Sequence, residues 1–168
     1  LTANVLTCIF IGYLQFKYEA FGTHYGLATL VPTIVSFGCA YYFDNKSVLT
    51  IAVTGLAAYV GLSVTPQDIF NDNNNFYANQ SLSYSAVFLS VLLVLWTTYS
   101  YKINLKTHFA LVYLTFALHI ISVACISNMV GYELTWLLFA LILAGSSVYF
   151  YKASYQQKSI SLYVFMII

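Results

Sequence analysis

Residues 107–132 read THFALVYLTFALHIISVACISNMVGY, a mostly apolar run without Asp, Glu, Lys or Arg. Four further uncharged runs occupy residues 20–43, 47–67, 73–101 and 134–151. A helix needs roughly 20 apolar residues to cross a hydrocarbon layer that is about 30 Å thick. The spacing of the charged residues therefore predicts helices that cross a membrane.

The composition excludes an ordinary water-soluble domain. Charged residues make up 7% of the 168 residues and apolar residues make up 61%, whereas typical globular chains have about 25% and about 45–50%. The net charge of +1 and the lack of a basic patch argue against a nucleic-acid partner. We therefore expect the lipid bilayer to be the main partner, with other membrane subunits as further candidates.

Seven membrane segments are expected, and they define an all-α fold, a multi-pass bundle of transmembrane helices. Helices are expected because the backbone polar groups of a segment in lipid must bond within that segment. The five complete segments have 18 to 20 residues, whereas the strands of a membrane barrel are short and alternate in polarity. The segments lie approximately at residues 1–16, 25–43, 47–64, 82–101, 108–127, 132–151 and 159–168.

The two ends of the sequence suggest a truncated protein. It begins with Leu1 rather than Met, and it stops at Ile168 inside an apolar run. The first segment lacks the basic start and the small-residue cleavage site of a signal peptide. We expect a single membrane domain over residues 1–168, with a helix shortened or lost at each end.

The loop charges predict the orientation of the bundle. Alternate loops fall on the same side: those around Lys17, Asp68 and Glu133 hold one Lys and four acidic residues, and the others hold five Lys and one acidic residue. The positive-inside rule places the lysine-rich loops in the cytoplasm, and we expect an inner (cytoplasmic) membrane, with residues 65–81 outside. The expected cytoplasmic lysines are Lys46, Lys102, Lys106, Lys152 and Lys158.

His119 is the ionisable side chain near the middle of an expected membrane segment. Such residues are costly inside membranes and often functional, but a neutral imidazole bonded to a nearby hydroxyl or carbonyl is the plainer interpretation. Ser122 lies three residues further on, on the same helix face. Together with Thr50 and Thr54 on another segment, these residues form a candidate intramembrane polar site.

Small side chains recur at helical spacing on three expected segments. Such faces let helices approach closely, so helix packing is the favoured interpretation and a polar pathway is the alternative. Pro32 is expected to bend the segment at residues 25–43. The packing candidates are Ala57 and Gly61, in line with Thr50 and Thr54, then Ala140, Ala144 and Ser147, and finally Thr29, Thr33, Ser36 and Ala40.

The remaining polar groups predict no catalytic residue, no metal site and no cofactor. Cys8, Cys39 and Cys125 lie inside apolar runs and lack the spacing of metal ligands. Asp68 and Asp72 do not follow the pattern of a calcium-binding loop. The sequence also lacks a nucleophile elbow and a phosphate-binding loop.

Two stretches resemble a known family. Residues 12–16 read GYLQF and are followed by FGTHYGLAT at residues 21–29, while YFDNK at residues 42–46 leads to SVTP at residues 63–66. They are similar to the predicted membrane proteins of the domain of unknown function 2157 family, in the form common in Bacteroidetes. The resemblance implies further helices before the start of this chain. Because that family has no assigned activity, it implies no site residues.

Three kinds of function fit these patterns. The lack of converging polar groups favours a non-enzymatic membrane protein with a structural, sensory or assembly role. The alternative is a transporter or channel for a small solute or ion, with a path near His119. The third is a membrane enzyme whose catalytic part lies outside this sequence.

Overall fold

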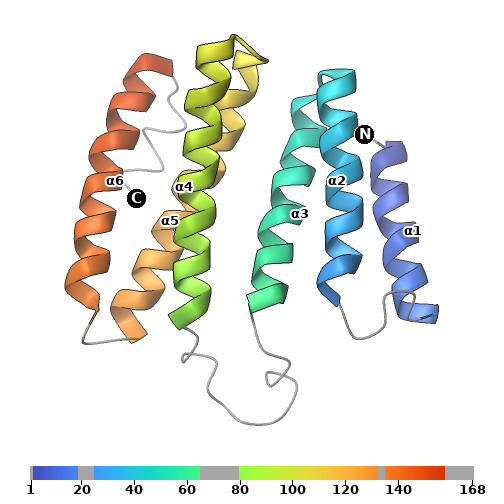
Figure 1. Cartoon of the computed structure of the whole chain (residues 1–168), viewed down its shortest axis with the longest axis horizontal. Coiled ribbons are helices and arrows are strands. Elements are labelled where there is room, and N and C mark those ends of the chain that lie inside the picture. The colour runs from blue at the N-terminus through green and yellow to red at the C-terminus, as the bar shows by residue number, and fades with distance from the viewer. Residues whose placement is uncertain (1, 19–24, 65–79, 132–134, 158–168) are drawn as a thin grey trace. The chain divides into compact units, whose positions relative to one another are not determined.

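The computed structural model describes residues 2–18, 25–64, 80–131 and 135–157. These residues form six α-helices and one short 3-10 helix, with no strand among them, so the all-α prediction is confirmed. The elements are α1 (Thr2–Tyr18), α2 (Tyr25–Phe43), α3 (Lys46–Val64), α4 (Gln80–Ile103), η3 (Thr107–Phe109), α5 (Ala110–Gly131) and α6 (Trp136–Gln157), as Figure 1 shows.

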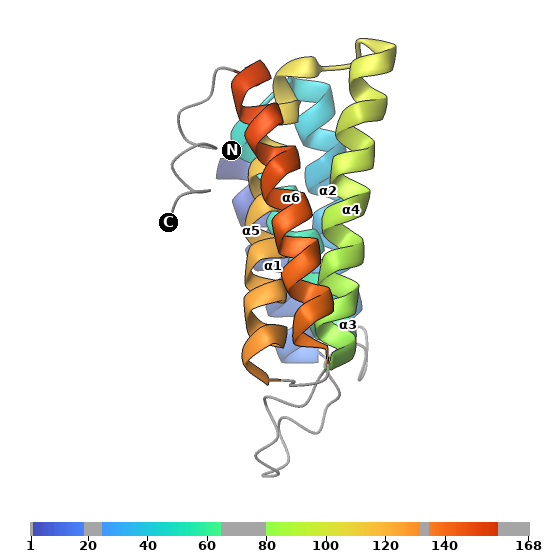
Figure 2. The ribbon, with the colours of Figure 1, turned by 90° about the vertical axis from the view of Figure 1, so that its left-hand side faces the viewer.

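The chain forms two compact units, Leu1–Asn73 and Asn74–Ile168. In the first unit, α1 and α3 both pack against α2. In the second unit, α4 and α6 both pack against α5 (Figure 2). The short helix η3 contacts α4 and α5. Consecutive helices within each unit run antiparallel (Figure 1), as expected for short connections. That the two units make a single domain stays a prediction.

Among the described residues, five helices are long and apolar enough to cross a membrane, so the prediction of seven spans is wrong in number. The first expected segment forms α1, but this helix has 17 residues, one fewer than the shortest of the five spans. The seventh expected segment, at residues 159–168, lies outside the described residues. The five spans are Gly26–Phe43, Lys46–Ser63, Ser81–Ile103, Thr107–Val130 and Trp136–Tyr155.

Helix α6 starts four residues later and ends six residues later than the segment expected at residues 132–151. The expected segment stopped before Lys152 because a charge was assumed to mark the edge of the lipid. The helix instead continues through Lys152, since backbone hydrogen bonding does not end where the apolar layer ends. The long apolar stem of a lysine lets its ammonium reach water from such a position.

The turn between α2 and α3 consists of Asp44 and Asn45. Asp44 has a φ of 54°, and the Asn45 N–H donates to the Ala40 carbonyl over 3.1 Å, which is the pattern of a Schellman C-cap. The Asn45 side-chain oxygen then accepts from the N–H groups of Ser47 at 2.9 Å and Val48 at 3.2 Å. Asn45 therefore helps to end one helix and caps the N-terminus of the next.

Helix α4 ends with a similar cap. Asn104 has a φ of 54°, its N–H donates to the Tyr101 carbonyl over 3.3 Å, and the Leu105 N–H donates to the Ser100 carbonyl over 3.0 Å. Lys106 follows with a φ of 47° and precedes η3. Two left-handed residues therefore reverse the chain between α4 and α5.

Contacts between helices combine close backbone approach with polar and aromatic pairs. A Cβ atom at Gly55 of α3 would overlap Thr33 Oγ1 of α2 and would lie 3.4 Å from Thr33 Cβ, so glycine lets these two helices approach closely. In the second unit, Ser90 Oγ of α4 donates to the Ala117 carbonyl of α5 over 2.9 Å. The rings of Tyr84 and Phe139, 5.6 Å apart, join α4 to α6.

Candidate functional site

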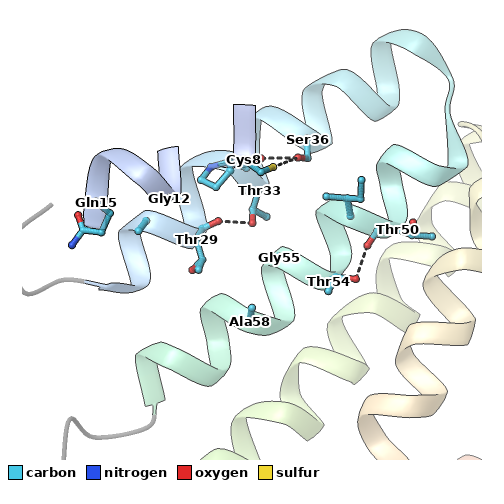
Figure 3. Close-up of a pocket in the computed structure, with 13 residues that line it drawn as sticks. Cys8, Gly12, Gln15, Thr29, Thr33, Ser36, Thr50, Thr54, Gly55 and Ala58 are labelled. Atoms are coloured by element: carbon cyan, nitrogen blue, oxygen red, sulfur yellow. Dashed lines mark hydrogen bonds between the residues drawn. The ribbon is translucent and has the colours of Figure 1, made fainter. Parts of the chain in front are cut away.

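A cavity of about 520 Å³ lies between α1, α2 and α3 in the first unit (Figure 3). We call it the α1–α3 groove. Among the described residues, its walls consist of small and hydroxyl-bearing side chains, together with Gln15, Pro32 and Ile51, and none of these carries a charge. Representative lining residues are Gly12 on α1, Ala28 and Ser36 on α2, and Gly55 and Ala58 on α3.

The hydroxyl groups of the groove donate to carbonyls of their own helices. A hydroxyl has one hydrogen and two acceptor lone pairs, so these groups present oxygen acceptors and methyl groups to the groove rather than unused donors. The bonds run from Thr29 to Gly26 (2.8 Å), Thr33 to Thr29 (2.6 Å), Ser36 to Pro32 (2.7 Å), Thr50 to Ser47 (2.7 Å) and Thr54 to Thr50 (2.8 Å).

A buried polar contact holds α1 against α2 beside this groove. Asn4 Nδ2 donates to Ser36 Oγ over 3.0 Å, and the Ser36 hydroxyl lies 3.2 Å from Asn4 Oδ1. Cys8 Sγ is 4.0 Å from the same Ser36 oxygen, and Figure 3 shows Cys8 and Ser36 pointing toward one another. Ser36 is 1% exposed and Asn4 is 7% exposed. The amide of Asn4 therefore has its partner on the neighbouring helix, which satisfies a group that lipid cannot.

Pro32 leaves one backbone carbonyl of α2 without its usual helical donor. Proline has no N–H group, so the carbonyl of Ala28, one turn earlier in α2, lacks its usual helical donor. Both residues line the groove, and α2 continues through Pro32 as one helix. Whether Pro32 bends α2 stays a prediction.

The four residues of the predicted polar site are divided between the two units. Thr50 and Thr54 line the α1–α3 groove, whereas His119 and Ser122 lie on α5 in the second unit. His119 is exposed, and its Nδ1 lies 2.6 Å from the Thr115 carbonyl oxygen. Because a carbonyl only accepts, Nδ1 carries the hydrogen of this bond. Ser122 is half-buried, and a joint role of the four residues stays a prediction.

On α3, the structure places Gly55 close to Thr33 of α2, whereas the packing roles expected of Ala57 and Gly61 stay predictions. Ala57 and Gly61 are both half-buried, and a Cβ atom at Gly61 would meet nothing within 4 Å. On α2, by contrast, three of the four small packing candidates are buried. These three are Thr33, Ser36 and Ala40.

The buried residues of α6 are Phe139, Phe150, Ala153 and Ser154. Phe139 and Phe150 are almost fully buried, and they lie near the two ends of the helix. Among the small residues predicted to pack, Ala140 and Ser147 are half-buried and Ala144 is exposed. The small side chains of α6 therefore lie mostly beside its buried face.

Asn128 on α5 is a buried polar residue that the sequence analysis missed. It is 1% exposed, and its Oδ1 accepts from Thr135 Oγ1 over 2.8 Å, next to the start of α6. Its Nδ2 has no hydrogen-bond partner in the part of the chain that the structure describes. The expected segment ended at residue 127, but an amide inside a long uncharged run was a signal that could have identified it.

Neither metal chemistry nor a relative assigns a function. The described residues contain no group of three or more His, Cys, Asp or Glu side chains that could hold a metal ion, and Cys8, Cys39 and Cys125 are free thiols. Comparisons with protein families, with curated proteins and with solved structures find no match to this chain. The resemblance to the domain of unknown function 2157 family stays a prediction.

Proposed function

We propose that this chain is a non-enzymatic, multi-pass membrane protein that assembles with another membrane subunit, and that a transmembrane helix of this subunit occupies the α1–α3 groove. The observation that carries the proposal is the lining of the groove. Small side chains from three helices surround it, and its hydroxyls already donate within their own helices. Small residues let a neighbouring helix approach closely in lipid.

The polar character of the groove favours a helix over a path for ions or polar solutes. Selective pathways are lined by rings of charged side chains or by carbonyls that replace water, and the described residues that line this groove carry no charge. The acceptor that lacks its usual donor is the Ala28 carbonyl. A Ser or Thr hydroxyl on the partner helix is expected to donate to it, as hydroxyls do between membrane helices.

The proposal places the protein in the inner membrane of a bacterium with its lysine-rich ends in the cytoplasm. Lys46 lies at the turn between α2 and α3, while Lys102, Lys106 and Lys152 lie at one end of the second unit. In a cysteine-free background, a reagent confined to the periplasm is expected to label Asn74→Cys and to spare Lys46→Cys and Asn104→Cys. The reverse labelling pattern would overturn the orientation and leave the groove proposal standing.

Site-specific photocrosslinking tests the occupant of the groove. Ala58 lines the groove and is exposed, so p-benzoylphenylalanine at this position is expected to form a discrete protein adduct in cells. Ile34 is the matched control because it is 61% exposed on the side of α2 that faces away from the groove. In a second variant, Gly12→Leu is expected to fill the groove. Gly12 lines the groove, and a Cβ atom at this position meets nothing within 4 Å, so the leucine side chain has room to extend into it.

Crosslinking at positions 58 and 34, with and without Gly12→Leu, shows whether a helix occupies the groove. A protein adduct at position 58 that is absent at position 34 and disappears with Gly12→Leu supports a helix in the groove. An adduct that persists with Gly12→Leu, or that forms equally at position 34, contradicts the proposal. Crosslinks to lipid alone at position 58 also contradict it, because they identify an acyl chain as the occupant.

A further inference from the structure

Helix α1 is attached to its unit differently from α3. Both helices pack against α2, and α3 does so more extensively. Helix α3 buries apolar side chains such as Ala52 and Val53, each 0% exposed. The buried residues of α1 are instead two amides, Asn4 and Gln15. None of the apolar side chains of α1, over residues 2–18, is therefore buried.

Glycine positions show the same difference in packing. A Cβ atom at Gly26 of α2 would lie 3.3 Å from the Tyr59 ring of α3, and one at Gly55 of α3 would overlap Thr33 Oγ1 of α2. At Gly12 of α1, which lines the α1–α3 groove (Figure 3), a Cβ atom meets nothing within 4 Å. Helices associate in lipid through close packing and hydrogen bonds. We therefore expect α1 to be held less firmly than α3.

The groove is too small for a membrane-spanning helix while α1 stays packed. Its volume is about 520 Å³, whereas two turns of a helix, about 11 Å long and about 10 Å across, occupy about 850 Å³. The groove therefore accommodates little more than one turn. A helix that crosses a membrane needs roughly 20 residues, so a wall of the groove must move to admit it.

We propose that α1 is a movable wall of the α1–α3 groove, and that a partner helix enters by displacing α1 from α2. The identity of the occupant, a transmembrane helix, rests on the proposed function. Helix α1 is the wall that moves because it is held less firmly than α3. Its side chains Leu6, Ile9 and Phe10 are each 60–62% exposed, so in a bilayer they contact acyl chains before and after the displacement.

The contact between Asn4 and Ser36 links the movement of α1 to the arrival of a partner. Asn4 Nδ2 donates to Ser36 Oγ over 3.0 Å, and the Ser36 hydroxyl donates to the Pro32 carbonyl of its own helix over 2.7 Å. When α1 moves away, Ser36 keeps the bond to Pro32, whereas the Asn4 amide loses its partner. An unsatisfied amide is costly in lipid, so α1 stays packed until another helix offers this amide a hydrogen bond.

A disulfide between α1 and α2 tests whether a bound partner displaces α1. Cys8 Sγ lies 4.0 Å from Ser36 Oγ, so Ser36→Cys brings two thiols close enough for a disulfide after small side-chain rotations. Cys39→Ala and Cys125→Ala remove the other two thiols. Membranes with p-benzoylphenylalanine at position 58 are illuminated first and oxidised afterwards. The disulfide is expected in chains without a protein adduct and is expected to be absent from chains in the adduct.

Distances between spin labels test the movement without a partner. Phe10 of α1, Ile34 of α2 and Leu62 of α3 are exposed. In the purified whole chain, otherwise free of cysteine, nitroxides on Phe10→Cys and Leu62→Cys report on α1, and those on Ile34→Cys and Leu62→Cys are the matched control. Asn4→Leu removes one hydrogen bond between membrane helices and is expected to raise the displaced fraction at least about threefold. The distances between positions 34 and 62 are expected to stay unchanged.

The two experiments separate the movement of α1 from the occupancy of the groove. Equal disulfide formation in both populations would overturn the movable wall and leave a helix in the groove. An unchanged distance distribution between positions 10 and 62 in Asn4→Leu would overturn the wall as well, and a disulfide in neither population would contradict the packed position of α1. Absence of a protein adduct at position 58 contradicts the proposed function instead, and the spin-label distances still decide whether α1 moves.

Discussion

Gly55→Ala tests whether α2 and α3 approach closely at this glycine. The test requires that the effect of crowding be distinguished from the higher helix propensity of alanine. The new methyl group would overlap Thr33 Oγ1 and would lie 3.4 Å from Thr33 Cβ and 3.8 Å from Thr33 Cα. The hydroxyl could leave only by rotating the Thr33 side chain, whose Oγ1 donates to the Thr29 carbonyl. The substitution therefore forces α2 and α3 apart or breaks this hydrogen bond.

The magnitude follows from comparison with a second glycine on the same helix. Overpacking costs about 1–3 kcal/mol, whereas the change from Gly to Ala in a helix gains up to about 1 kcal/mol. At Gly61 a Cβ atom meets nothing within 4 Å, so Gly61→Ala is expected to show the gain alone. Because the helix term cancels, Gly55→Ala should be less stable than Gly61→Ala by about 1–3 kcal/mol.

The free energy of unfolding can be measured by titrating the detergent-solubilised chain with a denaturing detergent and following helix content by circular dichroism. Thr33→Ala provides the rescue, since it removes the overlapping oxygen and leaves the contacts at 3.4 and 3.8 Å. In that background, Gly55→Ala should cost no more than Gly61→Ala. Equal stability of the two alanine variants, or a cost that persists after Thr33→Ala, would refute the close approach.

Three further substitutions test individual polar contacts. Asn45→Ala should lower the free energy of unfolding by about 1 kcal/mol because α3 loses its cap; Asn45→Asp should keep most of it, and equal losses would contradict the assignment. Ser90→Ala removes the hydrogen bond to the Ala117 carbonyl and should cost about 0.6 kcal/mol in the same titration; a loss above about 1.7 kcal/mol would point to a packing defect instead. Asn4→Ala should loosen α1 and speed maleimide labelling of Cys8, and an unchanged rate would show that this amide does not hold the helix.

The sequence predicted where helices lie better than which faces meet. Charges mark the ends of apolar runs, so the segment expected at residues 25–43 matches α2, and that at residues 47–64 starts one residue after α3 begins. The same assumption placed α6 too early, because it treated Lys152 as a limit. A lysine stem spans several ångströms of apolar surroundings, so a charge locates a helix end only approximately.

Helix faces were harder to predict because lipid makes both sides of a helix apolar. In water the apolar stripe of a helix points to the core, but in a bilayer lipid tails are as apolar as a leucine side chain. Small-residue spacing identified Thr33 and Ser36 on α2, which are buried, yet it missed Gly55. Its partner, Thr33, lies on another helix, and sequence spacing along one helix carries no information on the rotation of its neighbour.

Only some residues of the groove were predicted from the sequence, because spacing along one helix does not show which residues of other helices lie beside it. Thr50 and Thr54 were identified, and they line the groove, whereas the joint site expected of them with His119 and Ser122 stays a prediction. The contact between Asn4 and Ser36 links residues 32 positions apart, a separation that periodicity within one helix does not cover. A long-range polar pair of this kind requires a structure.

The surface of α1 indicates what surrounds the groove. Its buried residues are the amides Asn4 and Gln15, while Leu6, Ile9 and Phe10 are each 60–62% exposed. In water this arrangement would be unfavourable twice, because apolar side chains remain hydrated and polar groups lose water. In lipid both contributions become favourable. Exposed apolar side chains contact acyl chains, and buried amides are stabilised by hydrogen bonds to a neighbouring helix. The exposed face of α1 therefore favours lipid over water as its surroundings, and a partner that enters the groove from that side is expected to present an apolar surface.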